Sequence, residues 1–243
     1  VDAVRERKVF YCNNPDFKNK PTVKVYIHKK EDGIWSLIVE DKGIGMHLET
    51  IISYFLNAGA SFRLSRVWKE KFLDSTGKAK VLRSGRFGVG ALAAFMLADD
   101  PTEITMKVTT RHLHSNKEGA FEFETKLSDN PIQISYVNKE EVGTTIEILT
   151  KTPPSFMRES KKNEDNKGWD WYCLDFPIVE RISSSGKPLK QSINLPASIE
   201  TSSHDYHWIT TKDYDSVGWS YSDFPEIVCN GIIVSDNKYN RYA

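Results

Sequence analysis

The chain has 243 residues and a mass of 27.8 kDa, and its 33 Lys and Arg balance its 33 Asp and Glu, so the formal net charge is zero. This balance argues against bulk binding to nucleic acid or to an anionic membrane surface. The apolar run at residues 90–98 is too short to span a bilayer. Three widely spaced cysteines, with no CxxC pair, predict a reducing, cytoplasmic location.

The first elements predicted in chain order are a helix and a β-hairpin. Residues 1–7 favour a helix, and a polar turn follows at 13–15. Two stretches of alternating apolar residues, 23–28 and 35–40, flank Glu31-Asp32-Gly33. Alternation on both sides of a turn predicts paired antiparallel strands.

A glycine turn and a helix follow the hairpin. Residues 41–46 read Asp-Lys-Gly-Ile-Gly-Met, and apolar residues then recur at helical spacing over 48–55, up to Asn57-Ala58-Gly59. Residues 60–83, here called the basic segment, are rich in Lys and Arg and poorly periodic. This composition predicts a mobile surface segment, a candidate lid.

A second glycine cluster at 85–90 precedes an apolar, Ala-rich run at 91–97, which predicts a buried helix ending at Asp99-Asp100-Pro101. Alternating segments then predict an antiparallel sheet with one wet face. These segments are residues 103–111, 120–126, 132–137 and 144–149.

The rest of the chain predicts a boundary between two domains. Residues 155–167 are highly charged and favour a surface helix and loop, and residues 171–182 are aromatic and apolar. The Ser-Gly-Lys-Pro stretch at 183–188 is the best candidate linker, and 228–234 contains a hairpin-type Asn-Gly. We therefore expect one domain over 1–182, and a linker with the start of a second, β-rich domain over 183–243.

The two glycine clusters, Asp41-x-Gly43-x-Gly45 and Gly85-x-x-Gly88-x-Gly90, each precede a predicted helix. Free backbone N–H groups at such a position favour bound phosphate. No Gly-Lys-Ser/Thr follows, which excludes a P-loop, and the spacing and antiparallel strands do not fit a Rossmann fingerprint. Asp41 ends a strand, where its carboxylate could accept the amine protons of adenine; the alternative is an ordinary turn Asp.

These motifs, taken in order, resemble the GHKL superfamily of ATPases, which includes gyrase, the heat shock protein 90 chaperones, histidine kinases and MutL. Residues 41–46 are similar to its first glycine box, and residues 85–90 to its second box as written in the heat-shock chaperones. Gly143-Thr144-x-Ile146 is similar to its late Gly-Thr motif. The resemblance extends over residues 1–182.

The resemblance implies a Bergerat fold, an α+β two-layer sandwich that binds Mg-ATP between a mostly antiparallel sheet and its helices, beneath a lid. Asp41 and Thr144 would hold adenine, Gly45 and Met46 would line the base pocket, and Asn57 with Gly59 would lie beside the ribose, although later in sequence than in the chaperones. Gly85 to Gly90 would wrap the phosphates, with Arg86 as a phosphate contact or a solvated charge. The full set implied for ATP binding is Asp2, Asp41, Gly43, Gly45, Met46, Asn57, Gly59, Gly85, Arg86, Phe87, Gly88, Val89, Gly90 and Thr144.

The family's N box supplies a water-activating Glu and a magnesium-binding Asn. Val1 to Val4 resemble the tail of this box, so both residues are expected upstream of Val1, and neither a catalytic nor a metal-binding residue is assigned in this chain. Hydrolysis therefore rests on the resemblance. The alternatives are a non-hydrolysing nucleotide switch and, from another branch, a histidine-kinase domain, whose phosphoacceptor helix has no counterpart here.

The resemblance also implies self-association through the nucleotide domain and a protein client. The charge balance gives no direct evidence for a nucleic-acid partner, and the short apolar runs predict no membrane partner. Two further features have competing interpretations. His112 and His114 alternate along a predicted strand, but without a third ligand a metal site is disfavoured. The aromatic cluster of Trp169, Trp171, Tyr172 and Phe176 favours core or a domain contact over a stacking platform.

Overall fold

A computed structural model describes residues 1–10, 14–81, 88–128, 131–152, 176–183, 185–188, 226–229 and 232–236. The helices are α1 (Asp2–Phe10), α2 (Pro15–Asn19), α3 (Leu48–Thr50), the π-helix η1 (Ile51–Phe55), the 3-10 helix η2 (Phe62–Leu64), α4 (Arg66–Phe72), and the 3-10 helices η3 (Gly90–Met96), η4 (Pro101–Glu103) and η5 (Lys117–Gly119). The strands are β1 (Val23–Lys29), β2 (Trp35–Asp41), β3 (Thr105–Arg111), β4 (Ala120–Thr125), β5 (Ile134–Val137), β6 (Gly143–Thr150), β7 (Val179–Ile182), β8 (Glu226–Cys229) and β9 (Ile232–Asp236).

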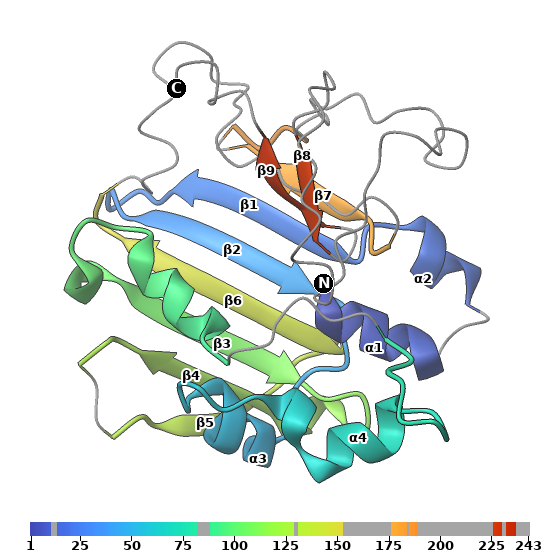
Figure 1. The fold of residues 1–243 in the computed structure, drawn as a ribbon. Helices are drawn as coiled ribbons and strands as arrows, with labels where there is room; N and C mark the ends of the chain where they lie inside the picture. The colour runs from blue at the N-terminus through green and yellow to red at the C-terminus, as the bar shows by residue number, and fades with distance from the viewer. Residues whose placement is uncertain are drawn as a thin grey trace, which may run out of the picture.

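Seven strands form one sheet in the order β5-β4-β3-β6-β2-β1-β7 (Figure 1). Every neighbouring pair is antiparallel except β1 and β7, which run parallel. Strand β6 therefore lies between β2 and β3, although residues 42–142 separate it from β2 in the chain. This order places the end of β2, the start of β6 and the end of β3 next to one another, although the three strands are distant in sequence.

Helices cover one face of the sheet, and that face forms the core (Figure 1). Val4 of α1, Ile51 of η1 and Phe95 of η3 are buried and belong to one cluster with the apolar strand residues. Those strand residues alternate with polar ones, so they share a face. They are Val23, Val25, Ile27, Leu37, Met106, Val108, Phe121, Phe123 and Ile148.

Polar side chains pair with one another on the opposite face of the sheet. Ser36 donates to Glu147 at 2.7 Å, and Lys107 pairs with Glu122 at 3.0 Å. The α+β sandwich predicted from the sequence, with a mostly antiparallel sheet and one polar face, is confirmed. The predicted hairpin and the four later strands are confirmed as β1 to β6.

Helix η3 corrects the prediction of a buried helix over 91–97. The segment is a 3-10 helix in which Phe95 is 6% exposed, but Leu92 is 40% and Met96 is 78% exposed. An uninterrupted apolar run hides a single buried stripe, because its outward residues are as apolar as its inward ones. The helix predicted after the first glycine turn is confirmed as α3, which continues as the π-helix η1.

The basic segment contains a helix that its composition did not predict. Helix α4 starts at an N-cap, Ser65, whose hydroxyl accepts the N–H of Trp68 at 3.1 Å. Trp68 and Phe72, four residues apart, pack with Val81 in a small core of their own. The spacing of Trp68 and Phe72 was the available helix signal. Asn14 likewise caps α2, where the sequence predicted only a turn.

The predicted domain boundary is described only in part. Strand β7 joins the sheet beside β1, and Ser183 then begins a turn in which its N–H donates to the carbonyl of Lys187 at 2.9 Å. Strands β8 and β9 form the expected hairpin. The predicted surface helix and loop at 155–167 and most of the aromatic cluster lie outside the described residues. Most of residues 189–243 also lie outside them, so the second domain stays a prediction. Within the described ranges, no helix has the length and apolarity needed to cross a membrane.

Candidate nucleotide site

Three polar side chains lie side by side where β2, β6 and β3 meet. Asp41 is the cross-strand partner of Thr144, and Thr144 is the partner of Thr110. Directly opposed residues in an antiparallel sheet point to the same face. The three side chains therefore point to the same face of the sheet as the apolar core residues. They form the polar end of this helix-covered face.

Asp41 is held by backbone donors in a partly buried position. Its Oδ1 accepts the N–H of Gly43 at 2.7 Å. Burial raises the pKa of the Asp41 carboxyl, while hydrogen bonds from the backbone of Gly43 and Thr144 and the charge of Lys139 act in the opposite direction. The carboxylate is thus fixed in place and costly to ionise, which is typical of a group kept for binding.

The first glycine turn packs directly on α1. A Cβ on Gly43 would lie 2.5 Å from the Cβ of Ala3, so only glycine lets the turn approach the helix this closely. The N–H of Ile44 donates to the carbonyl of Ala3 at 3.1 Å. Asp2, the residue before Ala3, therefore begins the helix that borders the turn.

Gly45 and Met46 continue the turn across the end of β3. Gly45 has a φ of +66°, and a Cβ there would lie 1.9 Å from the carbonyl oxygen of Arg111. The N–H of Met46 donates to the Thr110 hydroxyl at 3.0 Å. The structure thus brings together five residues of the predicted ATP-binding set. They are Asp41, Gly43, Gly45, Met46 and Thr144.

A second group forms around the end of the second glycine cluster. The N–H of Gly59 donates to the carbonyl of Gly88 at 3.2 Å, and a Cβ on Gly88 would lie 2.1 Å from the carbonyl oxygen of Ala60. Asn57 is exposed in the same turn, and its carbonyl accepts the N–H of Ala60 at 3.1 Å. The turn predicted beside the ribose therefore contacts the predicted phosphate loop.

The predicted phosphate loop, residues 85–90, is described from Gly88 onward. Val89 is 49% exposed, and a Cβ on Gly90 would meet no heavy atom within 4 Å. The backbone at Gly90 is thus open to approach. Gly85, Arg86 and Phe87 lie outside the described residues.

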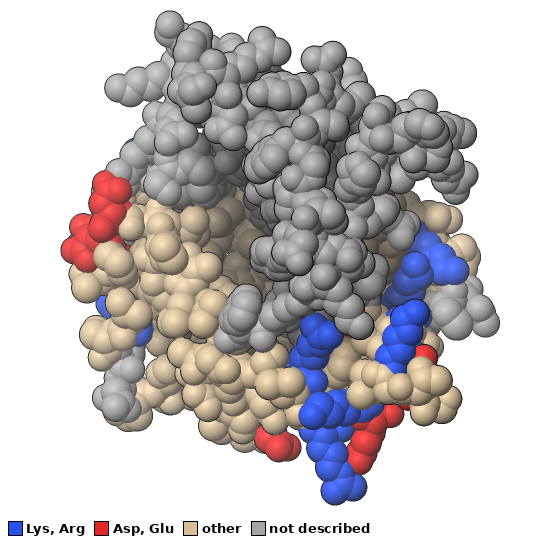
Figure 2. Space-filling view, viewed as in Figure 1, with Lys and Arg blue, Asp and Glu red and all other residues tan. Residues whose placement is uncertain are grey.

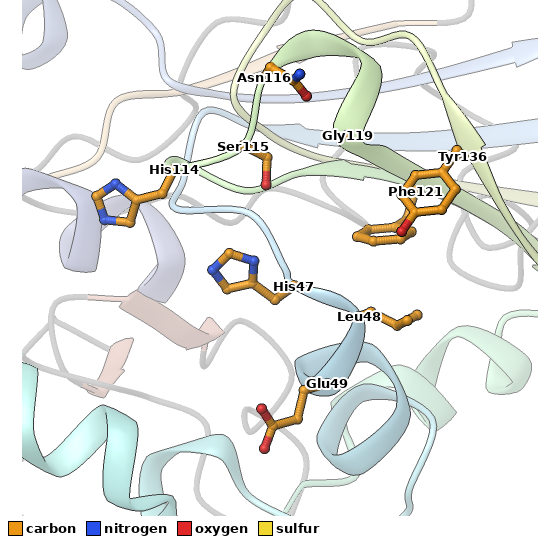
Figure 3. A pocket seen from close by; sticks show the side chains of 9 residues that line it. All are labelled: His47, Leu48, Glu49, His114, Ser115, Asn116, Gly119, Phe121 and Tyr136. Carbon is orange, nitrogen blue, oxygen red and sulfur yellow. The ribbon is translucent and has the colours of Figure 1, made fainter.

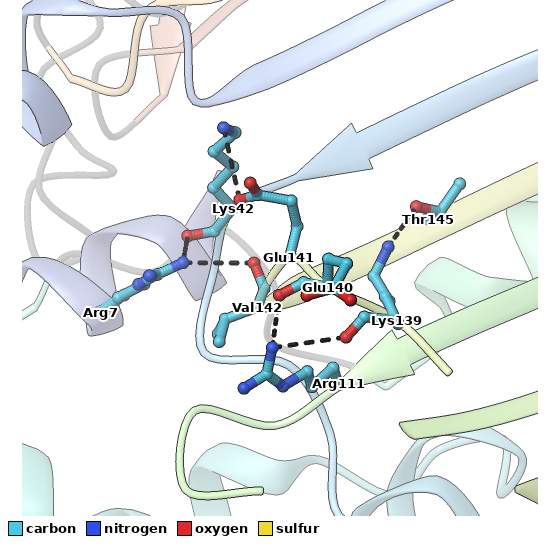
Figure 4. A network of polar contacts seen from close by, with 8 residues as sticks. All are labelled: Arg7, Lys42, Arg111, Lys139, Glu140, Glu141, Val142 and Thr145. Carbon is cyan, nitrogen blue, oxygen red and sulfur yellow. Dashed lines mark hydrogen bonds and ion pairs between the residues drawn. The ribbon is translucent and has the colours of Figure 1, made fainter. Parts of the chain in front are cut away.

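Two arginines, Arg7 and Arg111, bind backbone carbonyls of Lys42 and of the loop before β6 (Figure 4). Arg7 of α1 donates to the carbonyls of Lys42 and Val142, at 2.9 and 3.2 Å. Arg111 at the end of β3 donates to the carbonyls of Lys139 and Glu140 in the loop before β6. Both guanidinium groups tie backbone carbonyls from distant parts of the chain, so they set the position of the strand ends.

The basic segment is attached to α1. The indole N–H of Trp68 donates to the carboxylate of Glu6 at 2.7 Å, and both side chains are buried. Phe10 of α1 meets Phe72 edge-to-face, with ring centroids 6.0 Å apart. Figure 2 shows Lys and Arg gathered at the lower right, where Figure 1 places α4. The segment therefore presents cations on a packed module docked against the helix that begins at Asp2.

Three histidines lie where β3 ends and α3 begins, next to an open cavity of about 690 Å³. His112 and His114 follow β3 rather than lying on it, which corrects the prediction of a shared strand face. His47 stacks on His112, with ring centroids 3.4 Å apart. His47, His114, Phe121 and Tyr136 line the cavity (Figure 3). A third histidine is thus near, yet in the described part of the chain no three His, Cys, Asp or Glu are placed to hold a metal.

The histidine cluster predicts a loss of stability in acid. Burial, together with the charges of His47, His114 and Lys71, lowers the pKa of His112 from 6.5 to about 3. A depressed pKa means that the folded state disfavours the proton, so stability is full above pH 6.5 and falls as the pH drops toward 3. Because part of the ring reaches solvent, we expect about 1–2 kcal/mol less stability at pH 5 than at pH 7.

Urea unfolding at both pH values measures this loss, with His112→Asn as the comparison. An Asn oxygen can still accept the His114 N–H that His112 Nδ1 accepts at 3.1 Å, but it does not titrate in this range. The variant should therefore show a smaller difference between the two pH values. An unchanged difference would contradict the assignment of this loss to His112.

Sequence reasoning missed Thr110, Arg7 and Arg111. Thr110 offered one usable signal, a polar residue within a strand whose inward neighbours Met106 and Val108 are apolar. Such a residue needs a buried hydrogen-bond partner. The arginines were missed because the carbonyls that they hold at the strand ends, those of Lys42, Lys139, Glu140 and Val142, lie 28 to 135 residues away from them.

Comparisons with known proteins identify the family of the chain. The family described as histidine kinase-, DNA gyrase B-, and HSP90-like ATPase matches residues 13–144. The chain is 25% identical over 191 residues to the chaperone protein HtpG of Shouchella clausii, covering 77% of this chain and 27% of HtpG. It is 31% identical over 132 residues to HtpG of Rickettsia akari, covering 52% and 20% of the two chains.

A longer match, 26% identical over 240 residues, is to HtpG of Legionella pneumophila, and it covers 91% of this chain and 36% of HtpG. The chain thus spans about a fifth to a third of the length of these relatives. The family match covers more than half of the chain and includes the first glycine turn and Thr144. The chain therefore belongs to the family of histidine kinase-, DNA gyrase B- and HSP90-like ATPases.

Proposed function

We propose that this chain is an ATP-binding domain that hydrolyses ATP as part of an HSP90-like protein. The observation that carries the proposal is the corner at which Asp41 and Thr144 meet beside the glycine turn and α1. A fixed, partly buried carboxylate accepts amine protons, and the neighbouring hydroxyl can donate a hydrogen bond. Adenine offers both partners on one edge.

The remaining parts of the predicted site would act on the sugar and phosphates. Gly90 is open to close approach, and Gly88 is tied to the turn at Gly59. Backbone N–H groups in such a loop suit phosphate oxygens. The cations of α4, including Lys69 and Lys71, are proposed to attract the triphosphate, with residues 60–83 acting as the lid.

Magnesium is proposed to arrive with the nucleotide. Among the described residues, no three His, Cys, Asp or Glu are placed to hold a metal ion. When bound, Mg²⁺ would neutralise phosphate charge. The resemblance predicts its Asn ligand, and the Glu that activates water, upstream of Val1.

Self-association and a protein client are proposed from the relatives, which are named chaperone proteins. A cytoplasmic location remains a prediction from the cysteines. Cys12 and Cys173 lie outside the described residues.

Calorimetric titration of Mg-ADP tests the proposal, using protein that includes the sequence upstream of Val1. Saturable binding of one ADP per chain is expected. ATP hydrolysis is then followed as phosphate release, and binding without release would favour the nucleotide switch over the ATPase. A folded protein that binds neither ADP nor ATP would overturn the proposed function.

A further inference from the structure

Thr110 occupies a central place in the candidate site that sequence reasoning did not assign. It is fully buried on β3, and its Oγ1 lies 3.0 Å from the N of Met46 and 3.0 Å from the Oγ1 of Thr144. The carbonyl oxygen of Gly143 lies farther away, at 3.4 Å. One hydroxyl therefore connects the first glycine turn with the start of β6.

The hydrogen atoms at Thr110 can be assigned from these distances. A hydroxyl has one proton to donate and two lone pairs to accept. The N–H of Met46 can only donate, so it uses one lone pair of Thr110 Oγ1. The proton has two candidate acceptors, and the Thr144 hydroxyl at 3.0 Å is better placed than the Gly143 carbonyl at 3.4 Å.

This assignment sets the direction of the Thr144 hydroxyl. Because Thr144 accepts from Thr110, its own proton remains to be donated elsewhere. Its cross-strand neighbour Asp41 presents a carboxylate, which when ionised only accepts. The corner thus offers a ligand one donor beside one acceptor.

We propose that Thr110 is a positioning residue that fixes Thr144 as a hydrogen-bond donor and so makes the site select adenine over guanine nucleotides. The proposal rests on the proposed nucleotide binding. Adenine presents an amine donor beside a ring-nitrogen acceptor, which matches Asp41 and Thr144. Guanine presents a carbonyl acceptor beside an N–H donor, so both contacts would be mismatched.

The test is the ratio of ADP to GDP affinity in the parent and in Thr110→Val, measured by calorimetry. The variant keeps the side-chain shape but frees the Thr144 hydroxyl to rotate. We expect ADP to bind about ten-fold more weakly and the preference for ADP over GDP to fall by about ten-fold. Thr110→Ser keeps the hydroxyl and should retain the preference.

Thr109→Val is the matched control. Thr109 is the next residue along β3, faces the opposite side of the sheet and donates to Glu122 at 2.9 Å. It should leave both affinities unchanged. A double-mutant cycle with Thr144→Val adds a second check. Once the Thr144 hydroxyl is gone, Thr110→Val should not change the ratio of ADP to GDP affinity any further.

The outcomes separate the two proposals. A parent that binds neither nucleotide contradicts the proposed function. A parent that binds ADP, with an unchanged ADP to GDP ratio in Thr110→Val, overturns the role of Thr110, and so does an equal loss of both affinities. If Thr110→Val does not fold, Thr110→Cys, whose thiol is a weak donor, gives the same comparison.

Discussion

Replacing Asp41 by Asn is expected to weaken Mg-ADP binding by about 2–4 kcal/mol, or about 30- to 1000-fold. The backbone N–H groups of Gly43 and Thr144 both act on the Asp41 carboxyl. In the variant, these donors would take the amide oxygen, which leaves the amide NH₂ to face the adenine amine. Two donors would then oppose each other, and adenine would lose its acceptor.

The same change is expected to stabilise the ligand-free protein at pH 7. Burial raises the pKa of Asp41 above its ordinary value of 3.8, so ionisation costs the folded state free energy. That cost is absent below pH 3.8 and present once the pH exceeds the folded pKa. An amide does not ionise, so the advantage of Asp41→Asn should be seen at neutral pH and disappear in acid.

Calorimetry with Mg-ADP and thermal unfolding with and without nucleotide measure these two effects. Asp100→Asn is a matched control, since Asp100 also accepts a backbone N–H, from Thr102 at 2.9 Å, but is exposed at the start of η4. It should leave ADP binding unchanged. An Asp41→Asn protein that binds ADP as tightly as the parent would contradict the placement of adenine at Asp41.

The strands were predictable because their side chains alternate in polarity. Val23 to Ile27 and Met106 to Thr110 each show the alternation typical of a sheet with one apolar face. What alternation does not give is the pairing between strands. The register that places Asp41 beside Thr144, and Thr144 beside Thr110, depends on β6 lying between β2 and β3.

The motifs of the candidate site were predictable from the sequence, but the residues that hold these motifs in place were not. The glycine turn and Thr144 were identified from local sequence, and the structure brings them together. Arg7 and Arg111 were not identified, because a guanidinium that binds distant carbonyls looks like any surface charge in the sequence. Helix α4 was missed because basic composition outweighed the short spacing of Trp68 and Phe72.

Replacing Gly45 by Ala is expected to destabilise the fold by about 3–5 kcal/mol. Two separate costs contribute. The φ of +66° is unfavourable for any residue with a Cβ, and the added atom would lie 1.9 Å from the carbonyl oxygen and 2.5 Å from the carbonyl carbon of Arg111. Both contacts are with backbone, so no side chain can rotate away, and the turn or the end of β3 must move.

Gly77→Ala separates the two costs in this prediction. Gly77 has a φ of +80°, but a Cβ there would meet no heavy atom within 4 Å, so only the conformational cost of about 1 kcal/mol is expected. Urea unfolding of both variants gives the difference. Equal losses would mean that the first glycine turn does not pack against β3 as closely as described. A much larger loss for Gly45→Ala would show that the turn carrying Met46 is held by backbone contact with the strand end at Thr110, which is the contact on which the orientation of the candidate site depends.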